Sequence, residues 1–323
     1  GRSEVPFEWE GTLEKGNSLQ DMTSKVITAR YRSDQLADSH YLALRTYRDK
    51  LSQHIRHRGF LEECRDLMDI WQQSAADTST GTFVDVGANI GACSIYFAAN
   101  TLAFEPLPSN LYYFTKAVIL NRVRGKQALK NLRLFKVALD SNEVPKMIQM
   151  NVQRDNAGNA MVGRESFVVD TDNRLPTHEQ GMYYNISVPV ASFDMLLPKI
   201  FSRDKEYIGK RGIRVHLLKL DCQGAETNVL KGMKHLLHRD ETRPNYIYTE
   251  VDPLRLHAMG SSARELCNLL GNDYGYVMND PQGETFDTLV KELEEVSTKK
   301  GTLAATNILV RVPAAPQIQF SID

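Results

Sequence analysis

The spacing of apolar residues changes along the chain near residue 80. From Tyr41, apolar side chains recur every three or four positions in two stretches that Gly59 separates, which predicts two amphipathic helices. Their apolar positions are Leu44, Tyr47, Leu51, Ile55, Phe60, Cys64, Leu67 and Trp71. Because such faces do not remain in water, we expect both helices to pack near the carboxyl edge of the remaining domain, as part of a lid. Residues 1–20 are polar and aperiodic, which indicates an extended arm.

Beyond residue 81, short apolar runs alternate with amphipathic stretches, a pattern typical of βαβ units. The expected strands cover residues 82–86, 101–104, 132–138, 214–220, 246–251, 274–278 and 306–312. The expected helices cover residues 90–99, 109–122, 225–237 and 262–270. Within 144–190 the alternation stops, although 147–152 alternate like a hairpin strand and 164–180 are loop-like. The pattern predicts an open, mostly parallel, doubly wound α/β sheet over 78–313, an N-terminal helical appendage over 1–77 and a tail over 314–323.

A glycine-rich turn follows the first expected strand, in the segment FVDVGANIG. Glycines at such a turn permit positive φ and let a ligand approach the backbone, where the amides of a helix N-terminus face it. The spacing Gly87-x-Asn89-x-Gly91 differs from the G-x-G-x-x-G of dinucleotide sites, and Asp85 precedes it. An acid there repels a pyrophosphate but suits a cationic sulfonium or ammonium. The turn therefore favours S-adenosylmethionine over NAD, with a plain tight turn as the alternative.

A second acid follows the next strand, in LAFEP. Glu105 lies 18 residues after Gly87, where a carboxylate at a strand tip can accept the ribose hydroxyls of an adenosine. An acid at a strand end is by itself more often a solvated loop residue. Together with the glycine turn, it predicts a nucleoside site.

A third strand, acid and turn occur in LLKLDCQGAE. Because the carboxyl ends of parallel strands line the ligand crevice, Asp221 is a candidate general base, as is Glu250 after the next strand. Glu226 falls in a first helical turn, where dipole capping and a catalytic role are equally favoured. In the alternative, Asp221 with Glu250 or Asp252 binds a divalent, Mg²⁺- or Ca²⁺-like cation. We favour the metal-free arrangement and predict no metal site.

Several segments occur in an order that resembles one family. They are FVDVGANIGACSIYFAAN, AFEPLPSNLYYF, ALDSNE, NAGN, VPVASFDMLL and LLKLDCQGAETNVLKGM. Across about residues 80–312 they are similar to the FkbM family of class I, Rossmann-like methyltransferases. The resemblance implies O-methylation of a hydroxyl on a sugar, a polyketide or another small metabolite. It also implies that the cofactor is held by Asp85, Gly87, Asn89, Gly91 and Glu105, with Asp140 facing the adenine.

Two details of the resemblance leave alternatives open. The segment Asn156–Asn159 is a plain turn or an active-site loop. The family usually has a longer connection before the second strand than Asn100–Thr101 allows. Either the preceding helix is clipped, or residues are missing at this join, and we expect the latter because several residues are needed to reverse the chain.

Charge weighs against a nucleic-acid partner, since the formal net charge is −1. An RNA 2′-O-methyltransferase stays an alternative because of the basic run His54–Arg58 and of Lys219 beside Asp221. A solvated helix face explains that run better. His257 is more plausibly a structural hydrogen-bonding residue than a catalyst. A catalytically silent, cofactor-binding scaffold is the alternative outside the enzymes.

The four cysteines show no metal-ligand spacing and demand no disulfide, and Cys93 and Cys222 are expected as small buried residues. This favours a reducing, cytoplasmic compartment, although the start Gly-Arg-Ser allows a targeting segment to be absent. No apolar stretch approaches the ~18 residues of a membrane span. The expected partner is a small-molecule or glycan acceptor, and the oligomeric state is left open.

Overall fold

The computed structural model describes most of the chain between residues 27 and 318. The described residues are 27–31, 40–45, 49–59, 61–74, 81–97, 100–123, 129, 131–153, 161–162, 183–203, 214–280, 282–300 and 305–318. The segments 156–159 and 164–180, for which the sequence predicts a turn or active-site loop and a charged loop, lie outside these residues.

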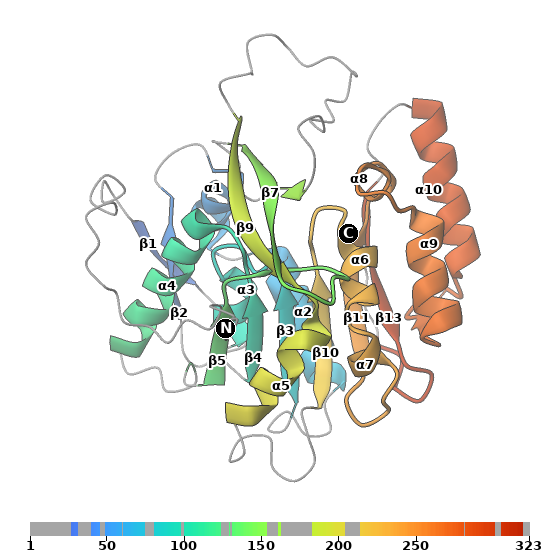
Figure 1. Ribbon diagram of the computed structural model, residues 1–323, viewed down its shortest axis with the longest axis horizontal. Coiled ribbons are helices and arrows are strands. Elements are labelled where there is room, and N and C mark those ends of the chain that lie inside the picture. Colours follow the sequence, from blue (N-terminus) through green and yellow to red (C-terminus); the bar gives the residue numbers. More distant parts are fainter. Residues whose placement is uncertain are drawn as a thin grey trace.

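Seven strands form the central sheet, in the order β12–β13–β11–β10–β3–β4–β5. Their bounds are Thr82–Val86 (β3), Thr101–Phe104 (β4), Leu132–Phe135 (β5), Val215–Leu220 (β10), Tyr246–Val251 (β11), Val277–Met278 (β12) and Thr306–Arg311 (β13). Strands β3, β4, β5, β10 and β11 are parallel, whereas β13 is antiparallel to both neighbours. The predicted open α/β sheet is therefore confirmed (Figure 1).

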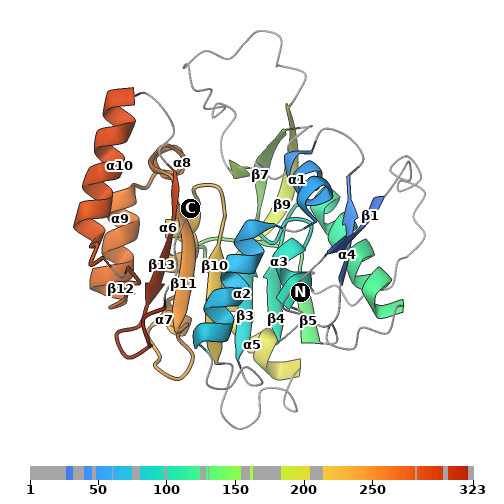
Figure 2. The ribbon, with the colours of Figure 1, turned by 180° about the vertical axis from the view of Figure 1, so that it is seen from behind.

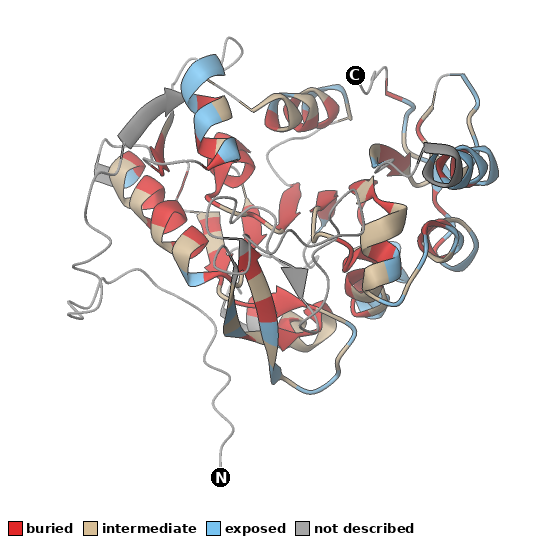
Figure 3. Ribbon diagram, turned by 90° about the horizontal axis from the view of Figure 1, so that it is seen from above, coloured by how far each residue is buried: buried red, intermediate tan, exposed pale blue. Residues whose placement is uncertain are grey.

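Helices cover both faces of this sheet, so β3 and β10 are buried along their whole length. One face packs against α2 (Glu62–Ser74), α3 (Ala92–Phe97) and α4 (Pro108–Val123). The other packs against α5 (Phe193–Arg203), α6 (Glu226–Lys231), α7 (Lys234–Leu237), α8 (Pro253–Ala258), α9 (Ala263–Asn268) and α10 (Phe286–Lys300). Side chains alternate along β3, so Phe83 joins the first core and Val84 the second. Figure 3 shows the buried residues gathered along the sheet and on the inward sides of the helices.

The N-terminal region begins with a hairpin, where the sequence pattern predicts helix from Tyr41. Strands β1 (Ile27–Tyr31) and β2 (His40–Leu44) pair antiparallel, and α1 spans Lys50–Arg58. The helix starts only after Asp49, whose carboxylate accepts a hydrogen bond from Ser52 N. Leu44, counted in the helical stripe, instead is fully buried in β2. The predicted helical appendage is therefore corrected to a hairpin followed by two helices.

Helix α2 covers a face of the sheet, as Figure 2 shows, and does not form the expected lid over its carboxyl edge. Its residues Leu67, Ile70 and Trp71 share a core with Phe83, and the Trp71 ring packs edge-on against Phe97. The apolar stripe explains why α2 lies on the face of the sheet. The stripe runs the length of the helix and therefore needs an equally long apolar surface to pack against. Only the first turn of α2 reaches the carboxyl edge.

A second sheet of four strands stands above that edge (Figure 1). It consists of β6 (Ala138–Leu139), β7 (Lys146–Gln153), β8 (Met161–Val162) and β9 (Tyr183–Ala191) in the order β6–β9–β7–β8. Strand β7 confirms the predicted hairpin strand. The strand expected over 132–138 is divided, since β5 ends at Phe135 and β6 joins the second sheet.

Several elements are shorter than the sequence pattern suggests. Helix α3 ends at Phe97, and the carbonyl of Asn100 already accepts a hydrogen bond from Phe83 N at 2.8 Å. The early end of α3 agrees with the first alternative, a clipped helix. The helix expected over 225–237 divides into α6 and α7 at Gly232, where an added Cβ would lie 2.1 Å from the carbonyl oxygen of Asp140. The strand expected over 274–278 is reduced to β12 after a π-helical turn, Leu269–Asp273. The sequence pattern did not predict β9, α5, α8 and α10.

Candidate active site

Three turns meet at the carboxyl edge, after β3, β4 and β10, and border an open cavity of about 610 Å³, solvent at its mouth included. Small-molecule sites usually measure about 300–1,000 Å³. Among the predicted site residues, the cavity is lined by Gly87, Asn89, Glu105 and Asp221. The other lining residues are Val86, Phe104, Pro106, Asn110, Val137, Ala138, Leu139, Met150, Cys222, Gln223 and Ala225.

The turn after β3 brings the backbone of Gly87 against the turn after β10. Gly87 has φ +79°, and a Cβ there would lie 1.9 Å from the carbonyl oxygen of Asp221. Gly91 also has positive φ, but a Cβ there would meet the ring of Phe114 on α4 at 2.3 Å. Gly91 does not line the cavity, and its close packing on α4 accounts for the absence of a side chain. Gly87 therefore determines how closely the two turns of the site approach each other. Gly91 determines how closely the turn packs on α4.

Glu105 is held by backbone amides on both sides of its carboxylate. Its Oε2 accepts a hydrogen bond from Asn89 N and its Oε1 from Leu107 N, each at 2.8 Å. Burial raises the pKa of Glu105 to about 7, against the opposing effect of these hydrogen bonds. A carboxylate has about four lone-pair positions, so Glu105 keeps capacity for a further donor besides its protein partners. A carboxylate held rigidly in this way can accept a hydroxyl group from a ligand.

Asn110 links Glu105 to the N-terminal region. This α4 side chain lines the cavity, hydrogen-bonds the carboxylate of Glu105 and accepts a hydrogen bond from Arg45. Arg45 also forms an ion pair with Asp49 at 3.0 Å. The segment before α1 therefore supports the wall of the cavity.

Asp85 lies on the other side of the β3 turn and does not line the cavity. It is 1% exposed, and Ser94 of α3 donates a hydrogen bond to its Oδ2 at 2.6 Å. Burial raises the pKa of Asp85, which the nearby ammonium of Lys219 opposes. Asp85 is adjacent to Lys219 in the parallel register of β3 and β10, so both side chains project from the same face.

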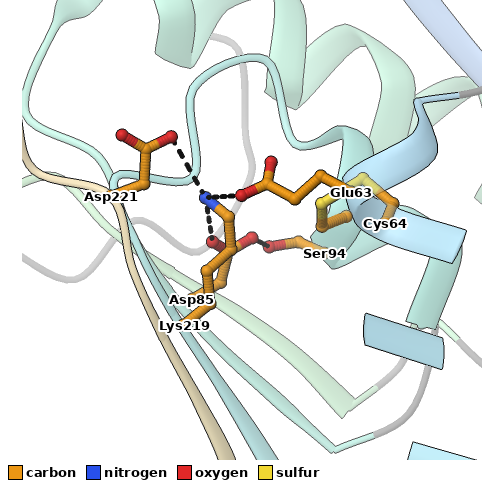
Figure 4. Close-up of a disulfide and its surroundings, with 7 residues drawn as sticks. Glu63, Cys64, Asp85, Ser94, Lys219 and Asp221 are labelled. Atoms are coloured by element: carbon orange, nitrogen blue, oxygen red, sulfur yellow. Dashed lines mark hydrogen bonds and ion pairs between the residues drawn. A yellow bond between two sulfur atoms is a disulfide. The ribbon is translucent and has the colours of Figure 1, made fainter. Parts of the chain in front are cut away.

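The ammonium of Lys219 is surrounded by three carboxylates (Figure 4). Its Nζ lies 3.5 Å from Asp221 Oδ2, 3.6 Å from Glu63 Oε1 and 3.8 Å from Asp85 Oδ1. The Lys219 side chain is 4% exposed. These three carboxylates raise the pKa of Lys219 well above its usual value, although burial alone would lower it. We call Lys219, Glu63, Asp85 and Asp221 the Lys219 cluster.

Asp221 belongs both to this cluster and to the cavity wall. Its side chain is 34% exposed, and its Oδ1 accepts a hydrogen bond from Gln223 Nε2 at 2.7 Å. Glu226 does not line the cavity; its Oε1 accepts hydrogen bonds from Cys222 N at 2.8 Å and Gly224 N at 3.3 Å. Burial raises the pKa of Glu226 to about 7. These hydrogen bonds fix the turn that carries Asp221.

Glu250 and Asp252 are engaged by one arginine outside the cavity wall. Arg255 lies 3.2 Å from Glu250 Oε2 and 3.3 Å from Asp252 Oδ2. Burial first, and then Asp221, raise the pKa of Glu250 to about 7, against Arg255. Asp252 also caps α8 by accepting from Leu254 N and Arg255 N. Among the described residues, no group of three or more His, Cys, Asp or Glu side chains is arranged to hold a metal ion.

Asp140 follows β6 of the second sheet and not the end of β5, so it lies away from the cavity wall. Its amide donates to the carbonyl of Ala191, and its carboxylate accepts from Ser141 N and Asn142. The chain turns away at Asp140 because β6 pairs with β9. The neighbouring residues Val137, Ala138 and Leu139 line the cavity instead.

A family model, "Methyltransferase FkbM domain", matches residues 85–278, more than half of the chain. The chain belongs to the FkbM methyltransferase family. A relative, "Methyltransferase 1" of Beauveria bassiana (strain ARSEF 2860), is 26% identical over 185 residues, covering 54% of this chain and 64% of that protein. The FkbM chain thus spans less than two thirds of the relative's length.

Two solved structures are similar to parts of this FkbM chain. Methyltransferase FkbM from Methylobacillus flagellatus KT has a TM-score of 0.30 and 14% identity, covering 54% of this chain and 33% of that one. Geranyl diphosphate methyltransferase in complex with SAM has a TM-score of 0.36 and 10% identity, covering 77% and 85%. Among the described helices of this FkbM protein, none has the length and apolar content needed to cross a bilayer.

A disulfide joins Cys64 of α2 to Cys93 of α3, beside the Lys219 cluster (Figure 4). The sequence pattern did not demand this bridge; packing of α2 on α3 brings together two cysteines that are 29 positions apart. The bridge removes the basis on which the sequence favoured a reducing compartment. Cys222, which was expected to be buried, is partly exposed and free, whereas Cys267 is free and buried.

Sequence reasoning missed Glu63 in this FkbM protein. Glu63 lies before the matched domain, and its only sequence signal is an acid in a first helical turn, which ordinarily indicates a favourable dipole interaction. The basic run 54–58 is partly neutralised, since His54 and Arg58 both pair with Glu62 at 2.5 and 2.7 Å. His257 is exposed on α8.

Proposed function

We propose that this FkbM protein is an S-adenosylmethionine-dependent O-methyltransferase that modifies a hydroxyl group of a small metabolite or sugar. The observation that carries the proposal is one cavity that Glu105 and Asp221 line together. Glu105 offers a rigid pair of acceptor oxygens, and Asp221 a partly exposed carboxylate. A nucleoside acceptor site and a candidate base therefore face the same space.

The residues present fit the cofactor. Gly87 lets the turn after β3 lie directly against the turn after β10, because a Cβ there would collide with the carbonyl oxygen of Asp221. The side-chain oxygens Asn89 Oδ1 and Gln223 Oε1 are buried, belong to residues that line the cavity, and have no hydrogen-bond partner. Unpaired buried acceptors are costly, so a ligand rich in donors suits them. S-adenosylmethionine carries an ammonium, an amino group and two ribose hydroxyls, and when bound it supplies a methyl group on a sulfonium centre.

The protein's own part is to bind, orient and accept a proton. Glu105 would hold the ribose hydroxyls, and the Gly87 turn would position the methionyl part against the backbone. Asp221 would accept the proton of the acceptor hydroxyl, because it lines the cavity and its carboxylate is partly exposed, while Glu226 fixes its turn. Apolar residues of the second sheet, such as Met150 and Leu139, also line the cavity and would help to exclude water.

The two alternatives from the sequence gain no support from the described residues. The basic run on α1 that motivated an RNA substrate is engaged by Glu62, and Lys219 is buried within its cluster. A silent scaffold would not need a carboxylate such as Asp221 in the cavity wall beside the nucleoside acceptors.

The test combines cofactor binding with a methylation screen. Calorimetry should detect S-adenosylmethionine binding by the wild type and an affinity reduced about ten-fold or more by Glu105→Ala, because charge-assisted hydrogen bonds contribute about 1.5–3 kcal/mol. Methyl-labelled cofactor should then label hydroxylated small molecules or sugars, with NMR placing the label on oxygen. No binding by a folded wild type, or an affinity that Glu105→Ala leaves unchanged, would contradict the cofactor assignment.

A further inference from the structure

Glu63 reaches the candidate catalytic centre from outside the matched methyltransferase domain. We propose that Glu63 is a positioning residue for methyl transfer: by sharing the ammonium of Lys219, it keeps the carboxylate of Asp221 available to the acceptor hydroxyl. This inference rests on the proposed function. The N-terminal region would thereby complete the active site as well as cover the sheet.

The geometry places Glu63 and Asp221 in competition for one cation. Lys219 Nζ is nearly equidistant from Glu63 Oε1, at 3.6 Å, and Asp221 Oδ2, at 3.5 Å. An ammonium has three N–H groups, and the third carboxylate, Asp85, also accepts from Ser94. Because Lys219 is almost fully buried, solvent does little to screen these interactions.

The charge of Glu63 determines how strongly Lys219 stabilises Asp221 as an anion. With Glu63 ionised, three carboxylates share the ammonium, so Lys219 holds Asp221 less tightly. With Glu63 neutral, Lys219 interacts mainly with Asp221 and Asp85, and it holds Asp221 more tightly. A carboxylate that accepts the proton of the acceptor hydroxyl must give up part of its contact with the ammonium, so tighter pairing should slow this step.

Two features hold Glu63 in place. Leu67, Ile70 and Trp71 fix α2 against the sheet, with Glu63 in the first turn of the helix. The next residue, Cys64, is disulfide-bonded to Cys93, whose neighbour Ser94 donates to Asp85 (Figure 4). The disulfide therefore connects the helix that carries Glu63 to the helix whose Ser94 hydrogen-bonds Asp85.

Glu63 is poised to change its charge near neutral pH. Burial raises its pKa to about 7, and Lys219 acts in the opposite direction. The titratable groups that face it from β3, β10 and β11 are Asp85, Lys219, Asp221, Tyr248 and Glu250. Below the pKa Glu63 is neutral, and above it Glu63 is ionised, so its effect on Asp221 should appear as the pH rises through about 7.

The test compares Glu63→Gln with wild type across pH, using an acceptor from the methylation screen. The variant should show a kcat roughly three- to ten-fold lower at about pH 8, because Lys219 then holds Asp221 more tightly. The ratio of the two kcat values should approach one at about pH 6, where Glu63 of the wild type is largely protonated. Glu63→Met, also neutral and of similar size, should behave in the same way and replaces Glu63→Gln if that variant does not fold.

Glu62→Gln is the matched control. Glu62 is in the same turn of α2 but pairs outward with His54 and Arg58, so its variant should follow the wild-type pH profile. Calorimetry should show that all variants bind S-adenosylmethionine about equally, since Glu63 does not line the cavity. A ratio of variant to wild-type kcat that stays constant with pH would overturn the proposed role of Glu63 but would leave the proposed function standing. A wild type that binds the cofactor but methylates no hydroxyl would overturn the proposed function, and this inference with it.

Discussion

The cavity around Glu105 and the Lys219 cluster share Asp221 but are held by different interactions. On the cavity side, hydrogen bonds to backbone groups hold the site residues in place. Glu105 accepts hydrogen bonds from two amides, and Asp221 N donates one to the carbonyl of Val86. On the cluster side, a buried ammonium depends on side chains from α2, β3 and the β10 turn. The cavity side can therefore be encoded in short motifs, whereas the cluster requires α2 to be packed on the sheet.

The strongest test of this difference is removal of the cation from the cluster. Lys219→Met leaves three carboxylates without their shared ammonium, and breaking a buried ion pair typically costs about 3–5 kcal/mol. We expect a loss of this size in the free energy of unfolding, measured with urea at about pH 8. The loss should shrink toward about pH 6, because the raised carboxyl pKa values let Glu63 and Asp85 take up protons that relieve the repulsion.

Lys231→Met is the control for that experiment. Lys231 pairs with Glu265 at 2.6 Å, but both side chains are about two-fifths exposed. Exposed pairs contribute about 0–1 kcal/mol, so this variant should differ little from wild type. Equal losses in the free energy of unfolding of the two variants would contradict the expectation that a buried ammonium contributes more to stability than an exposed one.

Removal of the disulfide should have the next largest effect on the cluster side. A bridge across 29 positions restricts the unfolded chain, and such bridges typically stabilise by about 2–4 kcal/mol. The double variant Cys64→Ser with Cys93→Ser should lose about this much stability in urea while still binding S-adenosylmethionine. Peptide mapping without reductant gives the direct check, and two free thiols at these positions would contradict the bridge.

The substitution Gly87→Ala adds one methyl group to the turn after β3 and tests the interactions on the cavity side. Gly87→Ala combines a positive φ with a Cβ 1.9 Å from the carbonyl oxygen of Asp221, so both turns must shift. Gly260→Ala is a matched control, because Gly260 has the same φ of +79° with nothing within 4 Å of its Cβ. The control should lose only the backbone strain of about 1 kcal/mol. Gly87→Ala should lose about 1–3 kcal/mol more, and should also lose cofactor affinity. Unchanged cofactor affinity in a folded Gly87→Ala protein would contradict the role of this turn.

Much of the fold could be predicted from periodicity. The strands β3, β4, β10, β11 and β13 agree with the expected runs within one residue or so. Of these, β3, β4 and β10 are buried throughout, and strands buried on both faces are continuously apolar. Predictions were weaker where burial is one-sided or where elements are short. Leu44 was assigned to a helix although it lies in β2, and the strand that should end before Asp140 divides between two sheets.

For the candidate site too, some residues could be predicted from the sequence and others could not. By itself the sequence determined the glycine turns and the acids Glu105 and Asp221 at strand ends, because backbone geometry at a strand-to-helix turn depends on a few neighbouring residues. Only the tertiary structure decided that Asp85 faces Lys219 and not the cavity, that Glu226 caps a turn, and that Glu63 and Cys64 reach the catalytic edge. Those contacts join residues far apart in the chain, and they form only when helix packing buries a charge that then requires partners.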